Sequence, residues 1–257
     1  MSTKVSAASD DLGRILDGIE QWVAIESPTA DKAAVNRMID RVAHDLAGLP
    51  ITLERLAGRD RFADILVARS PGAGERPGVL ILSHVDTVHP IGTLAGPLPL
   101  RREGDRLYGP GVFDMKGGAY VAMEAFRRVV RAGSARLPIT YLFTPDEEVG
   151  SPSSRAVIEA EARRARYVLV TEPARDGGKV ITARKGVGRF ELETIGVPAH
   201  SGARHQDGRS AIKEMARLVL AIEGMTDYAR GITTTVGMIA GGTAPNVNPQ
   251  HCRITAD

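Results

Sequence analysis

Apolar residues recur at helical spacing near the N-terminus and change farther along to short runs that are apolar at nearly every position. The run Val79–Ser83 is the clearest of these, and such runs are typical of parallel strands covered on both faces. Strands and helices then alternate as far as Thr171, which predicts an α/β domain. The expected elements are helices from Asp10 or Asp11 to Pro28 and from Asp31 to Gly48, strands at Ile51–Leu56, Ala63–Ala68 and Val79–Ser83, a helix at Lys116–Arg131, a strand at Ile139–Thr144, a helix at Ser153–Ala160 and a strand at Tyr167–Thr171.

A different pattern begins at Gly186, where a strand, a helix and two further strands are expected. These elements are a strand from Gly186 to about Gly196, a helix at Ser210–Ile222, a strand at Thr233–Ile239 and a strand that begins near Cys252. A sheet covered by one helix is a smaller α+β unit, so we predict two domains, 1–183 and 184–257. We expect the second sheet to lack a final helix and strand, and interpret the chain as a fragment.

Composition narrows the classes of function. Hydrophobic residues make up 43% of the 257 residues and charged residues 25%, which excludes global disorder. The 33 lysine and arginine residues alternate with 31 aspartate and glutamate residues, so no nucleic-acid partner is expected. Neither a secretory signal nor an apolar run of about 18 residues is present, which predicts a cytoplasmic protein without a membrane partner. Cys252 is the single cysteine, so a bound metal must use histidine and carboxylate ligands.

Acidic and imidazole side chains follow the ends of the predicted strands, where ligands gather in open α/β sheets. Each has an ordinary structural explanation: a local hydrogen bond, a helix cap, or a solvated acidic turn or strand end. Together, one histidine and three carboxylates suit a divalent metal bound through nitrogen and oxygen. The residues are His84 with Asp86 two positions on, Asp114 before a helix, the adjacent Glu147 and Glu148, and Glu172.

Motifs for other chemistries are absent from the sequence. It contains no His-Glu-x-x-His, no Gly-x-Ser-x-Gly and no phosphate-binding Gly-x-x-x-x-Gly-Lys-Ser/Thr motif. Five segments instead resemble, in order and spacing, the co-catalytic zinc aminoacylase/carboxypeptidase family, which includes glutamate carboxypeptidase, acetylornithine deacetylase and succinyl-diaminopimelate desuccinylase. The stretch from His84 to Gly150 is most similar to glutamate carboxypeptidase. The segments are Ser-His-Val-Asp-Thr-Val from Ser83, Tyr-Gly-Pro-Gly-Val-Phe-Asp-Met-Lys-Gly-Gly from Tyr108, Asp-Glu-Glu-Val-Gly-Ser from Asp146, Thr-Glu-Pro from Thr171 and Pro-Ala-His-Ser-Gly from Pro198.

The resemblance implies a fold, a reaction and a role for each matching residue. The fold would be a zinc-peptidase-like α/β domain, with a mixed sheet flanked by helices, and a smaller ferredoxin-like α+β lid that forms a homodimer. The reaction would be hydrolysis of an amide bond in an N-acyl amino acid or peptide by zinc-activated water. The implied roles are Asp114 as the bridge between two zinc ions, His84 and Glu172 at one ion, Glu148 at the other, Glu147 as general base, Asp86 as the residue that orients His84, and His200 and Asn246 as lid residues that polarise the scissile carbonyl.

The same resemblance implies that the peptide bond between Asp114 and Met115 is cis. It also implies a further histidine ligand and a carboxylate-binding arginine, which would both lie beyond Asp257. One zinc site is therefore expected to be incomplete. This leaves a non-catalytic metal- or ligand-binding module as the alternative function. A nucleotide-binding α/β protein, suggested by glycine content alone, is disfavoured because acidic residues stand where phosphates would bind.

Overall fold

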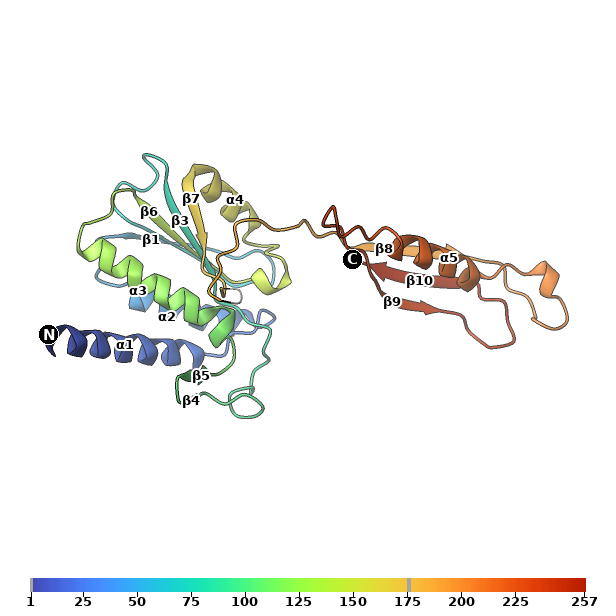
Figure 1. The fold of residues 1–257 in the computed structure, drawn as a ribbon, viewed down its shortest axis with the longest axis horizontal. Helices are drawn as coiled ribbons and strands as arrows, with labels where there is room; N and C mark the ends of the chain where they lie inside the picture. The colour runs from blue at the N-terminus through green and yellow to red at the C-terminus, as the bar shows by residue number, and fades with distance from the viewer. Residues whose placement is uncertain (1, 175–176) are drawn as a thin grey trace. The chain divides into compact units, whose positions relative to one another are not determined.

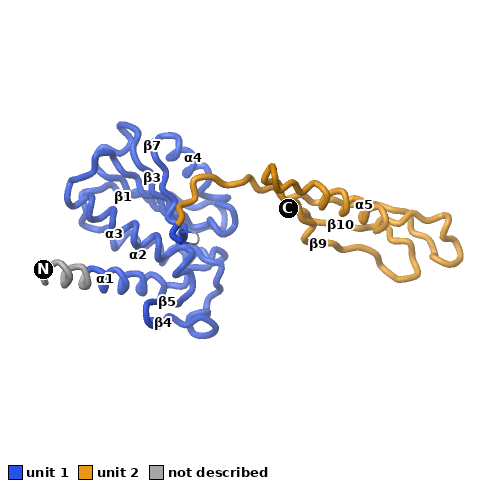
Figure 2. The backbone as a smooth tube through the Cα atoms, in the orientation of Figure 1, with its two compact units in different colours: residues 1–178 blue, residues 179–257 orange. Residues whose placement is uncertain are grey.

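The computed structural model describes residues 2–174 and 177–257. The chain folds as two compact units, Met1–Gly178 and Lys179–Asp257 (Figures 1 and 2). The domain boundary predicted between 183 and 184 falls just inside the second unit.

The first unit is built on a five-stranded mixed sheet with the order β1-β2-β6-β3-β7. Strand β3 lies between β6 and β7 and is parallel to both, whereas β1, β2 and β6 pair antiparallel. The continuous apolar run is therefore an interior parallel strand, as its sequence predicts. The strands are β1 (Thr52–Leu56), β2 (Ile65–Arg69), β3 (Gly78–His84), β6 (Ile139–Thr144) and β7 (Ala165–Val170).

Helices cover both faces of this sheet, which confirms the predicted α/β class. Side chains alternate across a strand, so Leu66 of β2 faces a core shared with three helices, while Val67 faces α4 and its neighbours. The helices of the first face are α1 (Ser2–Val23), α2 (Lys32–Asp45) and α3 (Gly117–Arg131), and the helix of the second is α4 (Arg155–Arg164).

The start of α1 differs from the prediction. The helix begins at Ser2 and not at Asp10 or Asp11, because the residues before these aspartates include no proline or glycine that would end it. The side chain of Asp11 forms ion pairs with Arg14 and Arg128.

The second unit is a three-stranded antiparallel sheet in the order β8-β10-β9, with one helix. Helix α5 packs Met215 against Cys252 and Ile254 on one face of the sheet. The elements are β8 (Phe190–Ile195), α5 (Ala211–Glu223), β9 (Val236–Gly241) and β10 (His251–Ala256). The strand expected from Gly186 begins only at Phe190, because the pairing with β10 ends where Ala256 meets Phe190.

Short elements fill the long connection between β3 and α3, the turn after β6 and, in the second unit, the connection between β8 and α5. They are the hairpin of β4 (Arg101–Glu103) and β5 (Arg106–Tyr108), a π-helical turn η1 (Val112–Lys116), and the 3₁₀ turns η2 (Glu147–Val149) and η3 (His205–Asp207). Among the helices of the described residues, none has the length and apolar character that a bilayer span requires.

Candidate metal centre

The predicted ligands meet at one edge of the first sheet because of strand direction. Strands β3, β6 and β7 are parallel, so His84, the turn after Thr144 and the segment after Val170 reach the same edge. Asp114 comes to this edge from η1, directly before α3. The structure thereby brings together five side chains that lie up to 88 positions apart in the sequence, namely His84, Asp114, Glu147, Glu148 and Glu172.

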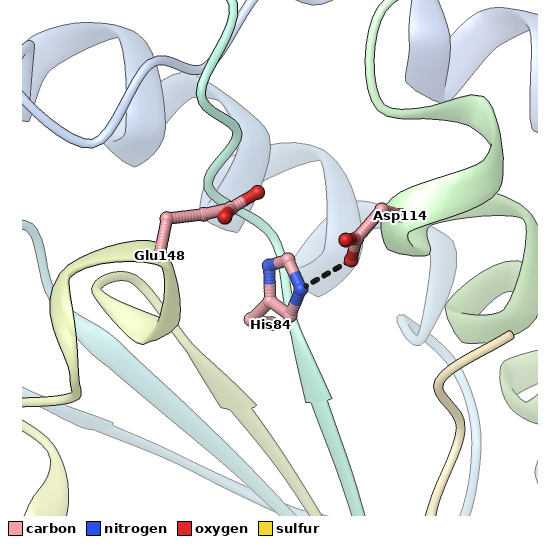
Figure 3. A group of neighbouring side chains, drawn as sticks. All are labelled: His84, Asp114 and Glu148. Carbon is pink, nitrogen blue, oxygen red and sulfur yellow. Dashed lines mark hydrogen bonds and ion pairs between the residues drawn. The ribbon is translucent and has the colours of Figure 1, made fainter. Parts of the chain in front are cut away.

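His84 is the centre of this cluster and is 2% exposed. Its Nδ1 lies 3.0 Å from the main-chain oxygen of Asp86 and accordingly donates to it, which directs Nε2 toward the carboxylates. Nε2 lies 3.0 Å from Asp114 Oδ1 (Figure 3). Glu172 Oε1 is 3.6 Å from the same nitrogen and Glu147 Oε2 is 3.9 Å from it.

Asp86 is fully buried and holds several parts of the site at once. Its Oδ1 lies 3.4 Å from His84 Nδ1 and accepts the main-chain N–H of Glu147 at 3.2 Å. Its Oδ2 accepts the hydroxyl of Thr29 at 2.7 Å and the main-chain N–H of Glu148 at 3.3 Å. The carboxylate therefore fixes the acidic turn as well as the imidazole ring.

The donor set fits a divalent cation such as zinc. Two groups have ligand atoms that all lie within 4.8 Å of one another: His84 with Asp114 and Glu148, and His84 with Glu147 and Glu172. In Figure 3 the side chains of Asp114 and Glu148 point toward the imidazole of His84. Imidazole nitrogen and carboxylate oxygen are the ligands that zinc takes when no thiolate is available.

The pKa shifts within the cluster also favour a bound cation. Burial, together with the charges of Asp114 and Glu147, raises the pKa of Glu172 to about 7 against the opposing effect of His84. Burial also raises the pKa of Glu148. Burial lowers the pKa of His84, but the hydrogen bond and charge of Asp86 and the charges of Glu172 and Glu147 outweigh it and raise that pKa to about 9. Carboxylates crowded so closely hold extra protons, and a bound cation would take the place of that positive charge.

The loop that carries Asp114 has an unusual backbone. The peptide bond between Asp114 and Met115 is cis, as the resemblance implies. Gly111 has φ of 69°, and a Cβ atom there would lie 2.5 Å from Thr87 Cγ2. A glycine is therefore required where this loop passes the strand end that carries His84.

Two buried charged residues at the site have no role in the sequence-based interpretation. Lys116, 1% exposed, donates from Nζ to the main-chain oxygen of Ile25 at 2.6 Å, and burial lowers its pKa to about 7. Asp146, fully buried, accepts the main-chain N–H groups of Ser153 and Ser154 and the hydroxyl of Ser154. Lys116 thus ties η1 to the segment after α1, and Asp146 holds the turn that carries the glutamates. Their signal in the sequence is only their place inside the two motifs.

His200 and Asn246 belong to the second unit and lie on neighbouring loops there. His200 pairs with Val247 in a single β-bridge, and Ser201 N–H donates to the main-chain oxygen of Asn246 at 3.0 Å. His200 is exposed, and its Nδ1 accepts the main-chain N–H of Ala203 at 3.1 Å. The fold of this unit thus brings together the two segments that carry the predicted lid residues.

Comparison with known proteins identifies the family to which this chain belongs. Residues 80–251 match the model of the peptidase family M20/M25/M40. The chain belongs to this family. The M20 relatives include carboxypeptidase G2 of Pseudomonas sp. (strain RS-16), 33% identical over 98% of this chain and 61% of the relative. Acetylornithine deacetylase of Myxococcus xanthus is 32% identical over 78% of this chain and 54% of the relative.

Solved structures share the fold. The aminopeptidase PepT from Bacillus cereus superposes with a TM-score of 0.74 at 20% identity, over 95% of this chain and 65% of that one. An M20 family metallo-carboxypeptidase from Sulfolobus solfataricus gives a TM-score of 0.64 at 15% identity, over 94% of this chain and 70% of that one. The chain thus spans 61% and 54% of the lengths of the two curated M20 relatives.

Proposed function

We propose that this protein takes part in metal-dependent hydrolysis of an amide bond in a peptide or N-acyl amino acid, in the manner of a glutamate carboxypeptidase. The observation that carries the proposal is the arrangement around His84, where Nε2 faces Asp114 at 3.0 Å and Glu172 at 3.6 Å. Membership of the M20 family and the 33% identity to carboxypeptidase G2 support a hydrolase of the carboxypeptidase or deacylase type.

We assign the metal ligands from the donor groups and from the family resemblance. Asp114 would be shared by two zinc ions, with His84 and Glu172 at one ion and Glu148 at the other. Bound zinc would supply Lewis-acid activation of water and of the substrate carbonyl. The grouping of Glu147 with His84 and Glu172 admits Glu147 as a ligand instead, and replacement of Glu147 separates the two assignments.

In the proposed reaction Glu147 is the proton carrier. Its side chain is 50% exposed at the rim of the cluster, where it can meet both water and substrate. The carboxylate takes a proton as the water oxygen bonds to the carbonyl carbon, and it returns that proton to the amine nitrogen as the C–N bond breaks. Asp86 keeps Glu147 in place because its carboxylate accepts the main-chain N–H of Glu147.

The second unit would serve as the lid. His200 and Asn246, on neighbouring loops, would donate to the carbonyl oxygen as negative charge develops on it. We assign the catalytic metal-binding part to 1–183 and the lid and dimerisation part to 184–257. A homodimer formed through the lid completes this proposal.

Reconstitution with zinc tests the proposed function. The metal-free protein should bind zinc at up to two ions per chain by elemental analysis, and the zinc-loaded protein should release free amino acid from N-acyl amino acids. Zinc binding without turnover of any N-acyl amino acid or dipeptide would favour a non-catalytic metal-binding module. Absence of zinc binding would overturn the assignment of the cluster.

A further inference from the structure

A cavity of about 490 Å³ opens beside the candidate metal centre, entirely within the first unit. Its volume lies within the range of about 300–1,000 Å³ typical of small-molecule sites. Asp114 and Glu148, two of the proposed ligands, form part of its wall, so a molecule in the cavity lies next to the metal centre. The other lining residues are Val88, His89, Leu98, Leu107, Tyr108, Gly109, Gly111, Val112 and Phe113.

The wall of this cavity is mainly apolar, and its rim is exposed. Phe113 is 72% exposed and Val88 is 67% exposed, although both lie beside a cluster of charged groups. Leu98 and Leu107 are half-buried deeper in the wall. Tyr108 is held by Arg101, whose guanidinium lies 4.1 Å from the ring centroid. Large apolar side chains left open next to a polar centre are typical of a surface that a ligand covers.

Charge decides which part of a substrate fits this cavity. None of the described residues that line it is a lysine or arginine that could pair with a carboxylate, and its two acidic residues, Asp114 and Glu148, are proposed zinc ligands. An N-acyl amino acid necessarily has its α-carboxylate on the amine side of the scissile bond. A carboxylate on this mainly apolar wall would lose its hydration without a cationic side chain to pair with, so the acyl side is the one that fits the cavity.

We propose that this cavity binds the acyl group of the substrate and selects uncharged apolar acyl groups, with Phe113 and Val88 as specificity-determining residues. The proposal rests on the proposed amide hydrolysis and deepens it, because it names the class of acyl group. Phe113 directly precedes Asp114 in η1, so its ring can contact the acyl group next to the scissile carbonyl.

Steady-state kinetics with a matched series of substrates tests this assignment. The zinc-loaded protein is assayed on the N-benzoyl, N-hexanoyl, N-acetyl and N-succinyl derivatives of one amino acid. The first two should exceed the last two in kcat/KM by about tenfold or more, as expected when several carbon atoms enter an apolar pocket. Phe113→Ala should lower kcat/KM for N-benzoyl by about tenfold, mainly through KM, and change that for N-acetyl by less than about twofold.

Two further variants separate a contact with substrate from a loss of structure. Val88→Arg should lower kcat/KM for N-benzoyl and raise it for N-succinyl, a reversal that misfolding cannot produce. Val121→Ala is the matched control, because Val121 is 50% exposed on α3 and does not line the cavity. Equal kcat/KM for all four acyl groups would overturn the proposal and leave amide hydrolysis intact. An equal loss on every substrate in Phe113→Ala would also overturn it, since the ring would then support the metal loop or the lid.

A ligand-binding experiment tests the cavity independently of catalytic turnover. Benzoate and succinate are titrated into the zinc-loaded protein, in which the cation offsets the charge of the acidic cluster, and followed by ligand-observed NMR. Benzoate should bind, succinate should bind at least about tenfold more weakly, and Phe113→Ala should abolish the difference. If no N-acyl substrate is hydrolysed but benzoate still binds more tightly than succinate, the proposed reaction is rejected and the apolar site is retained. Lack of any preference for benzoate would reject the site itself.

Discussion

Replacement of Asp86 by asparagine tests whether one buried carboxylate organises the metal centre. Its oxygens take part in three hydrogen bonds, from Thr29 at 2.7 Å, from Glu147 N–H at 3.2 Å and from Glu148 N–H at 3.3 Å, and one oxygen lies 3.4 Å from His84 Nδ1. An asparagine side chain replaces one oxygen by an NH₂ group, which would face donors in place of accepting from them.

The magnitude follows from this contact set. Whichever way the amide is turned, one pair of contacts is lost, either Thr29 with Glu148 N–H or His84 with Glu147 N–H. A hydrogen bond to a charged group contributes about 1.5–3 kcal/mol, and at least one such bond is lost in either orientation, so the free energy of unfolding should fall by about 1.5–3 kcal/mol or more. Loss of a carboxylate behind a metal-binding histidine typically lowers metal affinity by about 10–100-fold, and the same decrease is expected for zinc.

Two measurements on Asp86→Asn and on a control separate these effects. Chemical unfolding of the metal-free protein gives the change in stability, and competition titration with a chelator gives the zinc affinity. Asp45→Asn is the control, because Asp45 accepts Trp22 Nε1 at 2.7 Å and Arg41 Nε at 2.9 Å at the end of α2. The control should lose stability and keep wild-type zinc affinity. Zinc affinity within about twofold of wild type in Asp86→Asn would refute the positioning role.

The other predictions concern the base, the imidazole and the loop. Glu147→Gln should lower kcat by about 10²–10⁴-fold with zinc content unchanged, because the amide keeps the shape but cannot carry a proton; parallel loss of zinc and activity would instead identify Glu147 as a ligand. The pKa of His84, raised from 6.5 to about 9, gives the folded metal-free protein more bound protons than the unfolded chain. This contribution is complete below pH 6.5 and is lost as the pH rises through about 9, so the Tm of the metal-free protein should fall over that interval; a flat or rising Tm would contradict it. Gly111→Ala should lower the free energy of unfolding by about 1–3 kcal/mol and by more than Gly133→Ala, which also has positive φ but meets no atom within 4 Å; equal losses would show that the contact with Thr87 is unimportant.

Local pattern was enough to predict most of the architecture. The apolar run that forms β3 predicts an interior parallel strand, and β3 lies between two parallel neighbours. Helix α3 runs from Gly117 to Arg131, within one residue of the prediction. The beginning of α1 was wrong because its expected cap, Asp11, forms ion pairs inside a longer helix. The start of β8 was wrong because pairing with β10 ends at Phe190, and register is set by the partner strand.

The candidate site, like the fold, could be predicted from the sequence only in part. The order of strand ends predicts which side chains gather there, and the structure brings His84, Asp114 and Glu148 within ligand distance. Sequence spacing does not show that the carboxylate of Asp86 accepts main-chain N–H groups 61 and 62 positions farther on. Nor does it show the burial of Lys116, because that depends on how η1 packs against the end of α1. Such contacts depend on tertiary packing and not on local periodicity.

The position of β3 between two parallel partners also determines when the metal centre can form during synthesis. Both partners, β6 and β7, come later in the chain, and Glu172 follows the second of them. His84 therefore leaves the ribosome well before the strands that will flank it, and parallel pairing over such separations is slow. At about 5–20 residues per second, the 88 positions between His84 and Glu172 correspond to roughly 4–18 seconds of translation. During that interval the apolar run of β3 is a nascent strand without its neighbours, and its protection by chaperones should matter more than that of any helix in the first unit.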